Sequence, residues 1–90
     1  MNEDIRKDVT VVNDLGFHAR TAAQIAKIAQ KASSRVWLIK EDEKVDASSI
    51  IDILTLACGK GTRITISVED QSDHDLLIDI VELVESGFGE

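Results

Sequence analysis

The chain has 90 residues, with 17 acidic and 10 basic side chains and a formal net charge of −7 at pH 7. This length suits one small domain, residues 1–90, and leaves no room for a second. The acidic balance argues against nucleic acid as a partner, because such binding neutralises phosphates with Lys and Arg. No apolar run approaches the roughly 20 residues of a membrane-spanning helix, so we expect no membrane insertion.

The first residues and the cysteine content indicate a compartment. Met1 to Asp4 lack the basic head and apolar run of a secretory leader. Cys58 is the only cysteine, so it cannot form an internal disulfide. Both features favour a reducing, cytoplasmic location.

The first half of the chain predicts a strand, a helix and a hairpin. Residues 5–12 alternate in the manner of a strand, and β-branched residues dominate their second half. After turn residues 13–16, apolar side chains recur every three or four positions, which predicts an amphipathic helix over about residues 20–31. Residues 35–40 predict a second strand, and a short third strand follows around residues 44–45, across an acidic turn without the usual glycine.

The second half predicts helix, strand, helix. Ser49 and Asp52 have the spacing of a capping box, so a short helix should start there and run to about Cys58, where two glycines close it. Residues 64–68 alternate as a fourth strand. The last helix should begin at a second capping pattern, Ser72 to Asp75, and stop at Gly87. Strands with one apolar face and three helices to cover it predict a two-layer α+β sandwich.

His18 is the side chain that best suggests chemistry. It follows a glycine turn and directly precedes the first helix, near the unpaired N–H groups that make a helix start an anion site. Arg20 can add a planar cationic group for phosphate oxygens. A histidine at a helix start is more often a surface or capping residue, so His18 alone does not specify a function.

Three segments resemble one known family. Residues 13–23, NDLGFHARTAA, are similar to the active-site segment N-x-L-G-h-H-x-R-P-A-A (h, apolar) of the HPr family, the histidine phosphocarriers of the bacterial phosphoenolpyruvate-dependent phosphotransferase system. Residues 45–51 resemble the family's regulatory-serine segment, and residues 59–62 the turn before its fourth strand. The resemblance spans essentially the whole chain. It implies an open-faced βαββαβα fold, a four-stranded antiparallel sheet covered on one face by three helices.

The resemblance also implies a role for each site residue. His18 would accept a phosphoryl group on Nδ1 from phospho-enzyme I and pass it to enzyme IIA components of the sugar phosphotransferase system. Backbone N–H groups at Ala19, Arg20 and Thr21, with the Arg20 guanidinium, would hold the phosphate. The chain would then be a monomeric relay rather than an independent enzyme, and we expect no metal or cofactor. The alternative is a regulatory, nitrogen-branch-like carrier or binding module of the same fold.

Thr21 departs from the family pattern, which has proline at this position. Proline suits the first helical turn because its missing N–H would be unpaired there. Threonine is also accepted at helix starts, so a tolerated substitution is the simpler interpretation. The alternative hypothesis is that Thr21 donates a hydrogen bond to the phosphoryl group and changes the lifetime of phosphohistidine.

Ser49 aligns with the serine that a kinase/phosphorylase modifies in many family members. Phosphate there would add about two negative charges beside the docking surface and repel transfer partners. As a residue pattern alone, Ser49 is a helix N-cap. Asp52 adds a charge where the family often has glycine or a basic residue, which argues against recognition by such a kinase.

The short second helix carries more apolar side chains than its length would bury. The resemblance suggests that Ile50, Ile51 and Leu54 form a docking patch beside His18, with Lys27 at its rim. The alternative is that two of the three are ordinary core residues.

Other candidates are weaker. Residues 59–62 lack the spacing of a phosphate-binding loop and predict a turn. His74 is expected to be solvated, and His18, Ser49 and Asp52 have no nucleophile elbow to support a hydrolase triad. An independent small enzyme has no substrate-pocket signal. Trp37 and Cys58 are expected to be packing residues.

Overall fold

The computed structural model describes residues 5–90, so the prediction about a leader at Met1 to Asp4 lies outside the described residues. Four strands and three α-helices follow one another in βαββαβα order. Their bounds are β1 (Arg6–Thr10), α1 (Ala19–Ala29), β2 (Val36–Lys40), β3 (Glu43–Asp46), α2 (Ile50–Thr55), β4 (Arg63–Val68) and α3 (His74–Glu85). Single 3-10 turns occupy Gln71–Asp73 and Gly87–Gly89.

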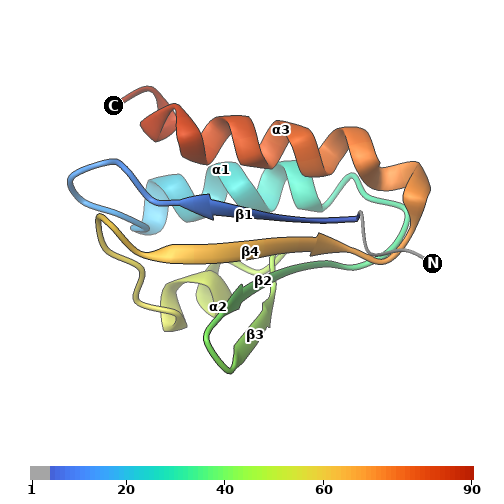
Figure 1. Ribbon diagram of the computed structural model, residues 1–90, viewed down its shortest axis with the longest axis horizontal. Helices are drawn as coiled ribbons and strands as arrows, with labels where there is room; N and C mark the ends of the chain where they lie inside the picture. Colours follow the sequence, from blue (N-terminus) through green and yellow to red (C-terminus); the bar gives the residue numbers. More distant parts are fainter. Residues whose placement is uncertain (1–4) are drawn as a thin grey trace.

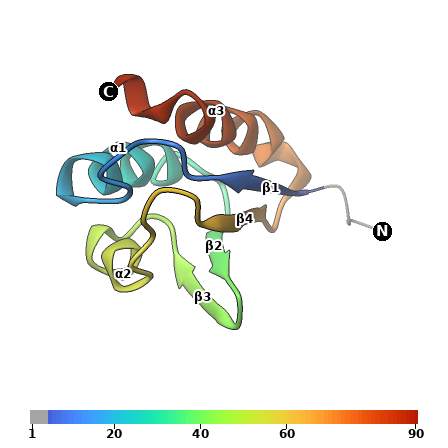
Figure 2. The same ribbon diagram turned by 60° about the vertical axis from the view of Figure 1, so that its left-hand side comes forward.

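The strands form one antiparallel sheet in the order β1-β4-β2-β3. All three helices lie on one face of it, with α1 next to α3 and α2 beside α1 (Figures 1 and 2). This arrangement confirms the predicted open-faced α+β sandwich. It also brings the β1–α1 loop to the same end of the molecule as the end of α3 (Figure 1).

The core lies between the sheet and the helices. Alternate strand residues, such as Val9, Leu38 and Ile66, point into it and are buried, as are Ile25 of α1 and Ile80 of α3. Small residues allow α1 to pack closely, because Ala22, Ala26 and Ala29 are all buried.

The alternation predicted for β1 is present, with one polar position on its inward face. Ile5, Val9 and Val11 are buried, but Lys7 between them is exposed. β1 is an edge strand, so the ammonium group of a lysine there can stay in water rather than be buried without a partner.

The prediction that α2 runs to about Cys58 and is closed by two glycines is wrong. The helix ends at Thr55, and Ala57 takes the left-handed conformation with φ 53°. Lys40 Nζ donates to the carbonyl oxygen of Leu56 at 2.8 Å, which satisfies a carbonyl that another helical turn would have used. Cys58 is buried, as expected, and burial raises the pKa of its thiol.

The predicted capping pattern before α3 is also wrong. Asp70, not Ser72, caps the 3-10 turn by accepting from the Ser72 N–H at 2.9 Å. Asp73 precedes α3 but accepts from the backbone N–H groups of Ser33 at 2.9 Å and Ser34 at 3.1 Å. A buried carboxylate thus ties α3 to the segment after α1, a contact that a local pattern cannot predict. The expected stop at Gly87 is confirmed, with φ 72° there.

The β2–β3 hairpin is confirmed, and Glu41 with φ 53° takes the place of the missing glycine at its tip. Trp37, expected to be a packing residue, packs at the surface of the sheet rather than in the core. It is partly exposed, and its indole lies against Arg35 and Lys44 and donates to Glu69 at 2.9 Å. Among residues 5–90, no helix combines the length and apolar character needed to cross a bilayer.

Candidate functional site

The loop between β1 and α1 is held by the chain that precedes β4. Val11 N–H donates to the Thr62 carbonyl at 2.8 Å, and Gly61 N–H donates back to the Val11 carbonyl at 2.7 Å. Phe17 N–H donates to the Cys58 carbonyl at 2.9 Å. These hydrogen bonds anchor both ends of the loop and so fix the position of His18, which follows it.

Gly16 allows the loop to approach that neighbouring backbone. Its φ is +64°, and a Cβ added there would overlap the Cys58 carbonyl oxygen and lie 2.7 Å from Gly59 Cα. Asn13 Nδ2 donates to the Gly16 carbonyl at 2.8 Å and closes the turn. The glycine is therefore required both by conformation and by space.

His18 is the N-cap residue of α1, and its backbone is extended with φ −132° and ψ −176°. Its carbonyl accepts from the Ala22 N–H at 2.8 Å, the first hydrogen bond of the helix. The partly exposed imidazole therefore stands at a helix start whose first turn contains no acidic residue. Such a start attracts an anion.

Thr21 is fully buried, and its hydroxyl is occupied locally. Thr21 Oγ1 accepts from the His18 N–H at 2.9 Å and has the carbonyls of His18 and Gly16 as acceptors at 3.2 Å and 3.3 Å. The Thr21 N–H faces the His18 side chain as in a capping box, without the geometry of a hydrogen bond. A hydrogen bond from this hydroxyl to a phosphoryl group would require its hydrogen to leave these acceptors, so the arrangement favours the simpler interpretation, a helix-start substitution.

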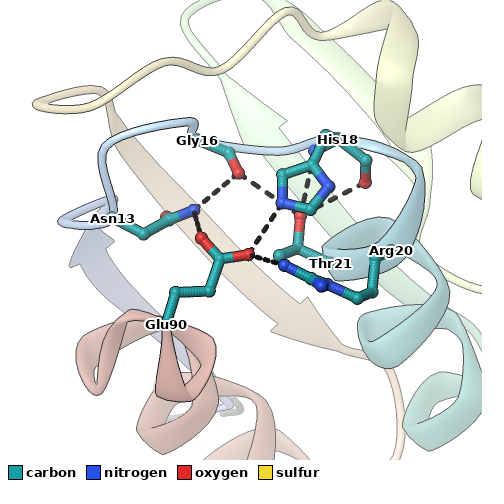
Figure 3. Close-up of polar contacts among 6 residues, drawn as sticks. All are labelled: Asn13, Gly16, His18, Arg20, Thr21 and Glu90. Atoms are coloured by element: carbon teal, nitrogen blue, oxygen red, sulfur yellow. Dashed lines mark hydrogen bonds and ion pairs between the residues drawn. The ribbon is translucent and has the colours of Figure 1, made fainter.

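A carboxylate that the sequence did not suggest lies against the histidine. Glu90 Oε2 lies 2.8 Å from His18 Nε2 and also accepts from Arg20 Nη2 at 2.8 Å (Figure 3). The other oxygen, Oε1, accepts from Asn13 Nδ2 at 3.1 Å. Three side chains from the loop and the first turn of α1 thus converge on one carboxylate.

The electrostatics of this cluster are those of an ionised acid. Arg20 first, then His18 and Asn13, hydrogen-bond to the Glu90 carboxylate and lower its pKa from 4.5 to about 2. The pairing also means that the positive charge expected at Arg20 is partly offset by Glu90. Arg20 itself remains largely exposed to solvent.

Aromatic packing holds the segment that carries Glu90. After α3 the chain passes through Gly87, Phe88 and Gly89, all with positive φ. Phe88 is buried and meets Phe17 edge to face, with ring centroids 5.8 Å apart. Phe17, which directly precedes His18, therefore contacts Phe88, which lies two residues before Glu90.

The predicted docking residues of α2 all reach the surface. Ile51 is 75% exposed, and Ile50 and Leu54 are 39% and 38% exposed, so none of the three is a fully buried core residue. Ile53 is the residue of α2 that is buried. Both views show α2 on the same side of the molecule as the start of α1 (Figures 1 and 2).

Two further exposed apolar side chains lie in the β1–α1 loop, and sequence reasoning missed them. Leu15 is 71% exposed and Val12 44% exposed. The signal was present, since Leu15 is an apolar residue within a turn. Lys27 is exposed in the last turn of α1.

Ser49 caps α2, and Asp52 N–H donates to its Oγ at 3.2 Å. No hydrogen bond within residues 5–90 joins His18 to Ser49 or Asp52, so the hydrolase triad is not formed there. Residues 59–62 form a turn without a helix after it. The described part of the chain contains no group of three or more His, Cys, Asp or Glu side chains able to hold a metal ion.

Comparison with known proteins identifies the family. The family model described as "PTS HPr component phosphorylation site" matches residues 5–86. A phosphocarrier protein HPr of Cupriavidus necator is 30% identical over 86 residues, covering 96% of this chain and 97% of that protein. A phosphocarrier protein NPr of Shewanella violacea is 31% identical over 86 residues, covering 96% and 94%.

The fold comparison agrees. The crystal structure of HPr-C-His from Thermoanaerobacter tengcongensis superposes with a TM-score of 0.88 and 35% identity, covering 94% of this chain and 96% of that one. Sequence, fold and the placement of a histidine at the first helix start lead to the same family. The chain belongs to the HPr family of phosphocarriers of the phosphotransferase system.

Proposed function

We propose that His18 is the phosphoryl-accepting residue, taking the group on Nδ1 from phospho-enzyme I and passing it to enzyme IIA components. The observation that carries this proposal is the position of His18 as the N-cap of α1, with Arg20 in the first turn. The N–H groups of Ala19, Arg20 and Thr21 have no carbonyl of α1 before them to bind, so they are available to an anion.

The reaction is a transfer between two nitrogens. A bond forms between His18 Nδ1 and phosphorus while the phosphorus–nitrogen bond of the donor histidine breaks, and the donor keeps the electron pair. Positioning and charge stabilisation dominate phosphoryl transfer, and both are supplied here by a helix start and a guanidinium. Because the site lies at the surface, the phosphoryl group stays accessible to the next acceptor. The chain acts as a relay rather than an independent catalyst.

The test is phosphorylation by enzyme I and labelled phosphoenolpyruvate. His18→Ala should abolish the acid-labile label, whereas His74→Ala, which removes the other histidine, should retain it. An acid-labile label that survives His18→Ala would refute the assignment.

A regulatory carrier is the second candidate, favoured by the NPr of Shewanella violacea among the relatives. The two functions differ in the acceptor of the phosphoryl group. Phosphorylated protein should transfer its label to sugar-specific enzyme IIA if it serves transport. Label that only a regulatory enzyme IIA accepts would establish the regulatory function instead.

The partners would dock on the exposed apolar side chains around His18. Ile50, Ile51 and Leu54 supply an apolar centre and Lys27 a charged rim, a composition that suits transient complexes. We place this domain, residues 1–90, in the cytoplasm as a monomer. Analytical ultracentrifugation at micromolar concentration should give the monomer mass.

Ser49 is proposed as a regulatory phosphorylation site for a serine kinase/phosphorylase. Its hydroxyl sits at the start of α2, where phosphate would meet unpaired N–H groups but would also face the Asp52 carboxylate in the first turn. Mass spectrometry after incubation with such a kinase should find the modification on Ser49 and not on the Ser49→Ala variant. An unmodified Ser49 would refute the proposal.

A further inference from the structure

We propose that Glu90 is the positioning residue of His18: its carboxylate accepts the Nε2 proton, leaves Nδ1 as the nucleophile and offsets the positive charge that the ring gains on phosphorylation. The inference rests on the proposed function, in which Nδ1 receives the phosphoryl group. It goes beyond that function because it assigns a role to a residue outside the 13–23 segment.

The first part follows from the 2.8 Å contact between His18 Nε2 and Glu90 Oε2. A neutral imidazole has one N–H donor and one lone pair, and an ionised carboxylate only accepts. Nε2 must therefore carry the hydrogen when it bonds to Glu90, and the lone pair lies on Nδ1. The same bond fixes the rotation of the ring, as carboxylates do for metal-binding and catalytic histidines.

The second part concerns charge. When Nδ1 bonds to phosphorus and Nε2 keeps its hydrogen, the ring has the charge of an imidazolium. A carboxylate at Nε2 stabilises that charge without being protonated itself, which is the role of the acid in a serine-histidine-aspartate triad. Glu90 can do so because its carboxyl is ionised throughout the neutral range, and the hydrogen bonds from Arg20, His18 and Asn13 lower its pKa further, to about 2.

Two independent features hold the carboxylate in place. Asn13 Nδ2 donates both to Glu90 Oε1 and to the Gly16 carbonyl, which links the carboxylate to the loop before His18 (Figure 3). The edge-to-face contact of Phe88 with Phe17 and the bond from the Glu90 N–H to the Gly87 carbonyl at 3.0 Å fold the segment back onto that loop. The contact is thus part of a packed turn.

Nitrogen-15 NMR of the imidazole measures the first part directly. At a pH where both histidines are neutral, His18 of the wild type should show a protonated Nε2 and an unprotonated Nδ1. Glu90→Ala should shift both nitrogens toward the averaged values of exchanging tautomers. His74, on the opposite end of α3 from Glu90, is the internal reference and should not change. Identical His18 shifts in wild type and Glu90→Ala would overturn the proposal.

Kinetics of phosphorylation by enzyme I measure the second part. Losing one partly exposed charge-assisted hydrogen bond should slow phosphorylation of Glu90→Ala by about five- to tenfold. Glu90→Gln keeps an acceptor oxygen without the charge and should retain the tautomer but only part of the rate. Glu85→Ala removes an equal charge from the exposed end of α3 and should behave as the wild type.

The outcomes separate this proposal from the carrier function. Label on His18 at equal rates in wild type and Glu90→Ala would overturn the role of Glu90 and leave the carrier function intact. A wild-type protein that enzyme I never labels on His18 would overturn both. A slower Glu90→Ala with an altered tautomer, beside an unchanged Glu85→Ala, is the expected result.

Discussion

Replacing Gly16 with alanine should separate the two reasons for a glycine in the loop before His18. The added Cβ would overlap the Cys58 carbonyl and approach Gly59 Cα, and the residue would keep φ at +64°. Neither obstacle is the movable end of a side chain. The loop must therefore shift away from the chain that precedes β4, and the hydrogen bond from Phe17 to Cys58 should weaken or break.

The magnitude follows from adding these effects. A left-handed conformation costs a residue with a Cβ about 1–2 kcal/mol. Overpacking against backbone adds about 1–3 kcal/mol, and the lost hydrogen bond about 1 kcal/mol. We expect Gly16→Ala to lower the free energy of unfolding by about 3–6 kcal/mol, a large part of the roughly 5–13 kcal/mol usual for a chain of this length.

Two other glycines serve as matched controls. Gly61 has φ +92° but open space around a new Cβ, so Gly61→Ala should show the conformational part alone, about 1–2 kcal/mol. At Gly59 a Cβ meets nothing and φ is not positive, so Gly59→Ala should be neutral or slightly stabilising. Urea unfolding followed by circular dichroism measures all three. If Gly16→Ala loses no more stability than Gly61→Ala, the close approach to Cys58 is not the reason for this glycine.

Three other substitutions or titrations test the rest of the structure. Asp73→Ala leaves two backbone N–H groups without their acceptor and should lower the free energy of unfolding by about 2–4 kcal/mol. The control Asp70→Ala removes an exposed cap and should cost about 1 kcal/mol. Equal losses in urea unfolding would contradict the tie between α3 and the segment after α1. Ile53→Ala should cost about 2–5 kcal/mol, whereas Ile51→Ala should leave stability unchanged and raise the KM of the enzyme I reaction; the reverse pattern would mean that the two faces of α2 are exchanged. Carbon-13 NMR should give the Glu90 carboxyl a pKa of about 2. Its contribution to stability is then complete above pH 4.5, the ordinary pKa of a glutamate, and is lost as the pH falls through about 2. A midpoint near 4.5 would show that the carboxylate is not bound.

Among residues 5–90, local patterns predicted the three α-helices and the four strands, because each of these signals depends on residues close in the chain. The alanine and isoleucine spacing located α1, and the glycine turn placed His18 directly before it. The patterns failed where a distant group competes for the backbone. Lys40 donates to the carbonyl of Leu56 just after the end of α2, and the Asp73 carboxylate binds the Ser33 N–H instead of capping its own helix.

The docking surface also has one property that the sequence predicted and one that depends on the fold. A six-residue helix cannot bury apolar side chains all round, so exposure of some of Ile50, Ile51 and Leu54 was predictable. Which of them are exposed depends on the side that α2 turns toward α1 and the sheet, and only Ile53 faces inward. Leu15 was overlooked because the sequence was searched for periodic apolar faces, and the signal at Leu15 is a single apolar residue within a turn.

The sequence by itself determined one small acidic chain with a histidine at a helix start, since turn chemistry and helical spacing are local properties. Only the tertiary structure decided what that histidine contacts. Glu90 lies 72 positions along the chain from His18, and it reaches the imidazole because α3 returns across the sheet and Phe88 packs against Phe17. No pattern of spacing encodes that contact, because it depends on the packing of α3 against the rest of the fold. The structure also decided the environment of Thr21, which stands where the family has proline: its hydroxyl is buried and accepts a hydrogen bond from the His18 N–H.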